Sequence, residues 1–88
     1  MPELSRFYGI VVRMQSEVGG KHNVPHLHAL YGNYEVTVSL DGFLLEGNFP
    51  IKKMKLLEAW MLIHSDELYK NWEMLQKGEG YFKIEELR

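Results

Sequence analysis

The sequence contains no cysteine, only three prolines and no long run of apolar residues. Without cysteine there is no disulfide, no thiolate nucleophile and no cysteine-ligated zinc or iron–sulfur site, so a bound metal would need histidine and carboxylate ligands. No apolar run approaches the ~20 residues that a membrane-spanning helix requires, and the first residues lack the basic-then-apolar order of a secretory signal. We therefore expect a cytoplasmic protein that does not associate with a membrane.

The charges of the chain are nearly balanced, with ten basic and twelve acidic residues and a formal net charge of −2. This balance gives no overall attraction to nucleic acid or anionic lipid, although a local basic patch remains compatible with it. The 88 residues are 45% hydrophobic and 25% charged, which is the composition of an ordinary globular domain. Residues 1–88 are therefore expected to form a single domain with one small core.

The hydrophobic pattern changes near Pro50, from the alternation of strands to the spacing of helices. This change predicts an α+β fold, in which a four-stranded antiparallel meander is followed by two α-helices packed on one face of the sheet. The predicted strands are residues 7–14, 26–31, 34–40 and 43–46, and the predicted helices are residues 50–64 and 66–77. Residues 81–85 are a candidate for a short C-terminal strand.

Turn and cap residues support these boundaries. Gly32-Asn33 favours a two-residue hairpin with a positive φ at the glycine, and Asp41-Gly42 is typical of a type I′ turn. Residues 15–24 contain a Gly-Gly pair and are expected to form the longest loop. A break between the helices is predicted at His64-Ser65, because serine is a good N-cap and two acidic residues follow it.

The most suggestive polar residues are His26 and His28. Residues two apart in a strand point to the same face with Cα atoms ~6.6 Å apart, so both imidazoles could reach one phosphate or one ion. A ribonuclease-like site would use one ring as base and the other as acid, whereas a metal site would add His22 or Glu35 as third ligand. The spacing requires neither, and a purely structural strand face is the single most frequent origin of such a pair.

Basic side chains near the histidines could complete an anion site. Arg6 and Arg13 flank the first predicted strand, and Lys21 lies in the loop before the second. If they converge with the histidine pair, they would bind a local negative charge despite the net charge of the chain. The lysines near the start of the first helix are instead expected to be solvated, and the two tryptophans are expected in the core. These residues are Lys52, Lys53, Lys55, Trp60 and Trp72.

Several short motifs together resemble a known family. They are Ser5–Ile10, Pro25–Ala29 with Tyr31-Gly32, Leu44–Gly47 with Pro50, and Glu67-Leu68 with Asn71-Trp72. The chain resembles the small prokaryotic family catalogued as domain of unknown function 4160. The resemblance implies a small stand-alone protein whose gene often lies beside that of a second small protein, an arrangement described as a type II toxin–antitoxin pair.

The resemblance places Arg6, Tyr8, His26 and His28 at polar motif positions of the family. Together with the histidine pair, the resemblance leads us to expect a toxin-like component of a two-gene module that acts on RNA or a phosphate-bearing target through His26 and His28. Arg6 or Arg13 would be the anion partner, and Tyr8 is a further candidate for binding the anion. The implied partner is the antitoxin-like small protein of the neighbouring gene, and no cofactor or metal is expected. A non-enzymatic protein-binding or regulatory module and a histidine-based metal-binding domain stay open as alternatives, as does the question of whether the protein is an enzyme.

Overall fold

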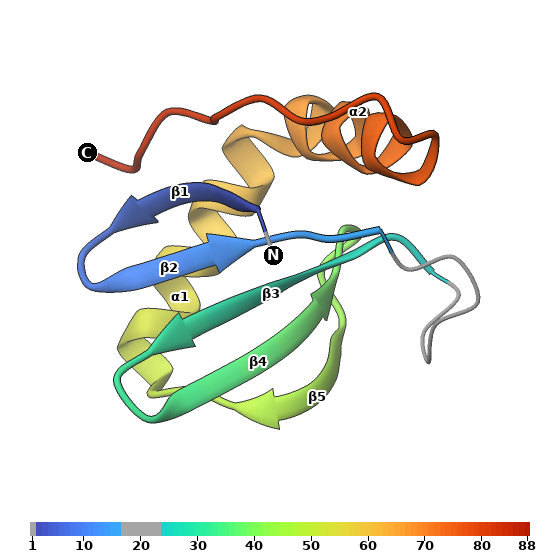
Figure 1. Cartoon of the computed structure of the whole chain (residues 1–88). Coiled ribbons are helices and arrows are strands. Elements are labelled where there is room, and N and C mark those ends of the chain that lie inside the picture. The colour runs from blue at the N-terminus through green and yellow to red at the C-terminus, as the bar shows by residue number, and fades with distance from the viewer. Residues whose placement is uncertain (1, 17–23) are drawn as a thin grey trace.

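The computed structural model describes residues 2–16 and 24–88 and contains a five-stranded antiparallel sheet followed by two helices (Figure 1). The elements are β1 (Glu3–Phe7), β2 (Ile10–Arg13), β3 (His26–Tyr31), β4 (Tyr34–Ser39), β5 (Leu44–Asn48), α1 (Ile51–Ile63) and α2 (Ser65–Gln76). The strands lie in the sheet in their order along the chain, so the sheet is a meander. The predicted α+β fold is confirmed. Neither helix in the described part of the chain is long and apolar enough to cross a membrane.

The first predicted strand, residues 7–14, is interrupted by the turn of a hairpin, and the residues before this turn form an additional, fifth strand of the sheet. β1 ends at Phe7 and β2 begins at Ile10, and these two residues are paired. The two residues between them, Tyr8 and Gly9, have φ values of 48° and 80°. Positive φ at both positions is what a two-residue turn matched to the strand twist requires. Tyrosine rarely adopts this conformation, which is why the turn is hard to recognise in the sequence.

The other two hairpins lie where the sequence predicted them. Tyr31 pairs with Tyr34 across a two-residue turn in which Gly32 has a φ of 57°. The turn at Asp41-Gly42 is present but is not of type I′, because only the glycine has a positive φ. The backbone N–H of Phe43 donates to the side-chain hydroxyl of Ser39 at 2.9 Å and not to a backbone carbonyl of β4. β5 therefore begins later than predicted, at Leu44.

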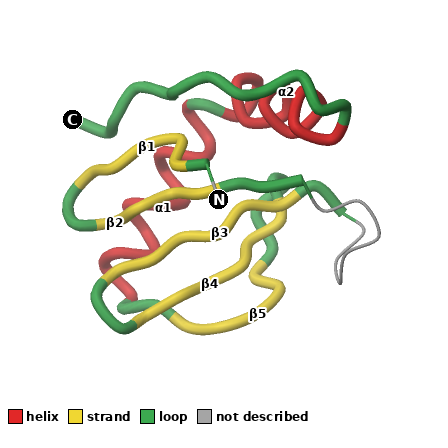
Figure 2. Tube along the Cα trace, viewed as in Figure 1, coloured by secondary structure: helices red, strands yellow, loops and turns green. Residues whose placement is uncertain are grey.

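The core lies between one face of the sheet and α1, which crosses behind the strands, while α2 lies beside β1 at one end (Figures 1 and 2). Val12, Ala29 and Val36, paired across neighbouring strands, are at most 1% exposed. They belong to the same core cluster as Leu57 and Trp60 of α1, both fully buried. Trp60 is thus a core residue as predicted, while Trp72 packs against the core and is only partly buried.

The helix break is confirmed, since α1 ends at Ile63 and α2 begins at Ser65 with His64 between them. The first turn of α2 carries Asp66 and Glu67, whose charge favours a helix N-terminus. The His64 Nδ1 lies 2.6 Å from the Glu67 carboxylate, and this contact stabilises the corner between α1 and α2. Of the lysines expected to be solvated, Lys53 instead donates to the carbonyl of Tyr8 at 2.9 Å.

Residues 81–85 do not form the predicted strand, although they lie along β1. Ile84 donates one backbone hydrogen bond to the carbonyl of Leu4 at 2.8 Å. The neighbouring backbone groups bind side chains instead: Asn71 bonds both the N–H and the carbonyl of Phe82, and the Trp60 indole donates to the carbonyl of Glu85. Because these partners come from the helices, the segment cannot form a regular ladder with β1.

Candidate functional site

The site begins with a row of polar side chains across the sheet. Directly paired residues of neighbouring strands point to the same face, and the register pairs Arg13 with His28 and His28 with Thr37. The row continues to Glu3 on β1 and Glu46 on β5. Since Val12, Ala29 and Val36 point toward α1, this polar row lies on the opposite face of the sheet. We call these five residues the polar row.

His28 is at the centre of the polar row and is half-buried. Its Nδ1 lies 3.2 Å from the hydroxyl of Thr37, and its ring meets that of His26 edge-on with 5.2 Å between centroids. The Thr37 hydroxyl can donate to or accept from this nitrogen, so it orients the ring in either tautomer. The structure thus brings the two predicted histidines together and adds a hydroxyl that the sequence analysis did not consider.

His26 differs from its neighbour because it is only 1% exposed. Its Nδ1 lies 2.8 Å from the carbonyl of Val24, and its ring packs 5.1 Å from that of Trp72. A carbonyl only accepts hydrogen bonds, so Nδ1 carries the proton in this contact. Of the two predicted histidines, His28 is therefore partly accessible and His26 is not, because Trp72 of α2 packs its aromatic ring against His26.

The two arginines have different surroundings. Arg6 donates to both carboxylate oxygens of Glu3, at 2.8 and 3.3 Å. This hydrogen bond holds the pKa of the Glu3 carboxyl below its ordinary value and raises the pKa of Arg6. The pair contributes to stability above the unfolded pKa of Glu3, and this contribution is lost as the pH falls through the lower folded pKa. Arg13 forms no ion pair within the described residues and lies beside His28.

The structure does not bring Tyr8 to the histidines. Tyr8 lies in the β1–β2 turn, at the opposite end of β2 from Arg13, and is 52% exposed. Lys21 and His22, which the sequence analysis also considered, lie outside the described residues, as does most of the loop predicted over residues 15–24. No group of three histidine and carboxylate residues with the arrangement of a metal site occurs in residues 2–16 and 24–88, where Glu35 pairs with Leu30 rather than with a histidine.

Thr37 is the site residue that sequence reasoning missed, although a signal for it was present. A two-residue turn at Gly32-Asn33 fixes the register of the hairpin, and that register places Thr37 opposite His28. The burial of His26 had no comparable local signal, since Trp72 belongs to a helix far along the chain.

Comparison with known proteins identifies the family. The family model described as a domain of unknown function (DUF4160) matches residues 9–73, which run from the β1–β2 turn to the last turns of α2. The match includes Arg13, His28 and Thr37, whereas Arg6, Tyr8 and β1 precede it. No curated protein and no solved structure matches the chain significantly. Because the match extends over well more than half of the sequence, the chain belongs to the DUF4160 family.

Proposed function

We propose that the protein is the toxin-like component of a two-gene toxin–antitoxin module and acts on RNA, as its phosphate-bearing target, through the polar row. The observation that supports this proposal is the register of β2, β3 and β4, which sets a guanidinium, an imidazole and a hydroxyl side by side at Arg13, His28 and Thr37. Arginine binds phosphate oxygens with two parallel hydrogen bonds, and imidazole exchanges protons near neutral pH. The three groups together match the needs of phosphodiester chemistry.

In the proposed reaction His28 acts as general base. It takes the proton from a ribose 2′-hydroxyl, whose oxygen attacks the adjacent phosphorus while the bond from phosphorus to the 5′-oxygen breaks and the leaving oxygen takes a proton from water. Arg13 binds the phosphate oxygens, on which negative charge increases during the attack. The hydroxyl of Thr37 holds the imidazole in place. Neither the 2′-hydroxyl nor the phosphate needs to contact any other residue of the row.

His26 is a positioning residue in this scheme, because a side chain that is 1% exposed does not touch the RNA. Its ring supports that of His28 from the side, and its own orientation is fixed by Val24 and Trp72. Replacing His26 by phenylalanine should therefore move the pH dependence of the reaction, through the changed surroundings of His28, rather than abolish the reaction. An unchanged pH profile with a lower rate at every pH would indicate a purely structural role.

We expect His28→Asn to lower the rate of RNA cleavage by ~10²-fold or more, because asparagine can replace the hydrogen bond to Thr37 but cannot act as a base. The measurement is cleavage of total cellular RNA by the purified protein, together with growth on induced expression without the neighbouring gene. Lys55→Asn on α1 is the control and should behave as the unmodified protein. Intact RNA and normal growth with the folded unmodified protein would contradict the proposal and favour the protein-binding alternative.

The second prediction separates the two arginines. Arg13→Ala should remove one phosphate contact and reduce the slope of log affinity against log salt by about 0.7 on single-stranded RNA. Arg6→Ala is the matched control and should leave the slope unchanged, because this guanidinium already bonds both oxygens of Glu3. The measurement is fluorescence anisotropy of a labelled RNA oligonucleotide over a series of salt concentrations. Equal effects of the two substitutions would show that the polar row does not bind the phosphate.

A further inference from the structure

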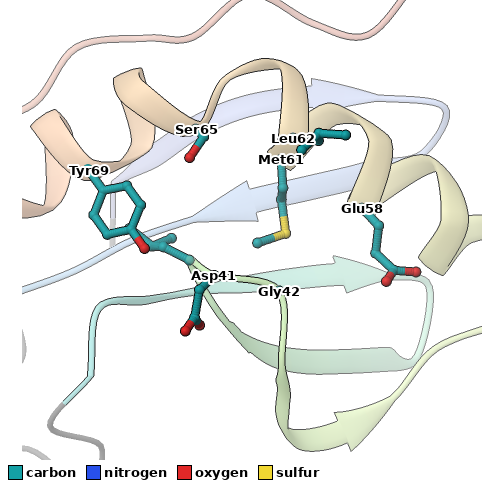
Figure 3. A pocket seen from close by; sticks show the side chains of 8 residues that line it. Asp41, Gly42, Glu58, Met61, Leu62, Ser65 and Tyr69 are labelled. Atoms are coloured by element: carbon teal, nitrogen blue, oxygen red, sulfur yellow. The ribbon is translucent and has the colours of Figure 1, made fainter.

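A pocket of about 430 Å³ lies away from the polar row, between the β4–β5 turn and the corner where α1 meets α2 (Figure 3). Its apolar wall is formed by Leu40, Met61, Leu62 and Tyr69, and the thioether of Met61 points into the space between the turn and the helices. Leu62 is 81% exposed and Tyr69 is 39% exposed, so these two side chains are accessible to a partner, whereas Leu40 and Met61 are buried beneath them. An exposed apolar pocket of this kind is typical of a binding site.

The pocket is also acidic. Asp41 from the turn and Glu58 from α1 line it, and none of its lining residues is basic. The carboxylate of Asp41 accepts a hydrogen bond from Ser39 at 2.5 Å, which fixes it at the turn, and Glu58 forms no ion pair within the described residues. The charge of the pocket therefore favours a cationic group placed next to an apolar one.

An exposed strand edge adjoins the pocket. β5 is the last strand of the sheet and is almost entirely exposed. Phe43, which connects the turn to this strand, and Leu44, its first residue, are 68% and 55% exposed. Edge strands present main-chain N–H and carbonyl groups that can pair with a further strand. The apolar surface of the pocket is thus continuous with a strand edge, whose main-chain groups can form a full set of hydrogen bonds only with an extended polypeptide.

We propose that the pocket and the edge of β5 together bind an extended peptide segment of a partner protein, in which a lysine or arginine stands two residues from an apolar residue, so that both side chains point to the same face of the added strand. The segment adds a strand along β5. Its basic side chain pairs with Asp41 and Glu58, and its apolar side chain packs on the exposed Leu62 and Tyr69 above Met61. This site is separate from the polar row and does not depend on the RNA-directed function proposed above.

The charges disfavour the other occupants. Two copies of this chain joined through this surface would bring Asp41 and Glu58 of each copy near those of the other, which costs energy through like-charge repulsion. The same carboxylates repel the phosphates of RNA. A small organic cation could pair with the acids, but it would leave the edge of β5 unused.

The test is a selection of phage-displayed random short peptides on the full-length protein, followed by affinity measurements on synthetic copies of the selected peptides. We expect the selected peptides to share a basic residue two positions from an apolar residue within a stretch of high strand propensity. Leu62→Lys should weaken their binding by at least about tenfold, because it replaces apolar contact by like-charge repulsion. Ile51→Lys is the matched control, since this residue is 76% exposed on the same helix but outside the pocket, and it should leave the affinity unchanged.

Amide chemical shifts of the protein on titration with a selected peptide should change along β5 and at the α1–α2 corner. The proposal would be overturned by selected peptides without basic residues, by equal binding to the Leu62→Lys and unmodified proteins, or by shift changes confined to another surface. Failure of the selection to enrich any peptide would also overturn it. Binding of free arginine amide with the same affinity as the peptides would show that the pocket takes a small cation and not a strand.

Discussion

Gly47→Ala is expected to lower the free energy of unfolding by about 3 kcal/mol or more, because two penalties coincide at this position. Gly47 has a φ of 87°, a conformation that costs an L-residue ~1–2 kcal/mol. A Cβ atom there would also overlap with the backbone carbonyl oxygen of Glu35 on the neighbouring strand. Backbone cannot rotate aside as a side chain can, so β4 and β5 would have to separate locally.

The control for this prediction is Gly42→Ala. Gly42 also has a positive φ, of 99°, but an added Cβ would meet no atom within 4 Å. Its cost should therefore be the conformational part alone, ~1–2 kcal/mol. Urea unfolding followed by circular dichroism measures both values. Equal destabilisation by the two substitutions would mean that β5 moves freely relative to β4. A mobile β5 would be a poor template for the peptide strand proposed to pair with it.

Asn71→Leu is the second substitution for which we expect a large effect. Asn71 is fully buried, and its amide donates to the carbonyl of Phe82 at 3.0 Å and accepts the N–H of the same residue at 2.8 Å. Leucine has a similar volume but leaves the N–H and the carbonyl of the partly buried Phe82 without their partner, at a cost of ~1–3 kcal/mol each. We expect a total loss of about 3 kcal/mol, which lowers the Tm of a domain of this size by about 12–24 °C.

A matched control and a local measurement make this prediction specific. Glu73→Leu on the exposed side of the same helix should change stability by no more than ~0.5 kcal/mol. Hydrogen exchange should further show that the amides of Phe82 and Ile84 lose protection in the Asn71 variant, because the C-terminal segment is held at this point. Retained protection of these two amides would show that Trp60 and β1 hold the segment without Asn71.

Local signals in the sequence were sufficient for most of the fold. The change of period at Pro50 separated sheet from helices, Ser65 with its acidic neighbours located the helix break, and Gly32-Asn33 fixed the hairpin of β3 and β4. That hairpin placed both histidines on one face. Such features depend on residues close together in the chain, whose conformational preferences act before any tertiary contact forms.

Local reasoning was wrong at both ends of the chain. The aromatic and β-branched residues from Phe7 onward suggested one long strand, but Tyr8 and Gly9 form a turn inside it that requires a positive φ at Tyr8, a rare conformation for that residue. Residues 81–85 have a strand-like composition, but their backbone groups are taken by Asn71 and Trp60. In the C-terminal segment, contacts distant in sequence thus override the local preference.

The sequence by itself determined the order of the elements, the antiparallel meander and the alternation that sets His26 and His28 on one face. Only the tertiary structure decided that Trp72 covers His26 and that Arg13 of β2 stands beside His28. The physical reason is that burial and the pairing of strands across a long loop depend on which distant surfaces meet. Which surfaces come into contact is decided by the packing of whole helices and strands, and it cannot be predicted from the hydrophobic periodicity of a single segment.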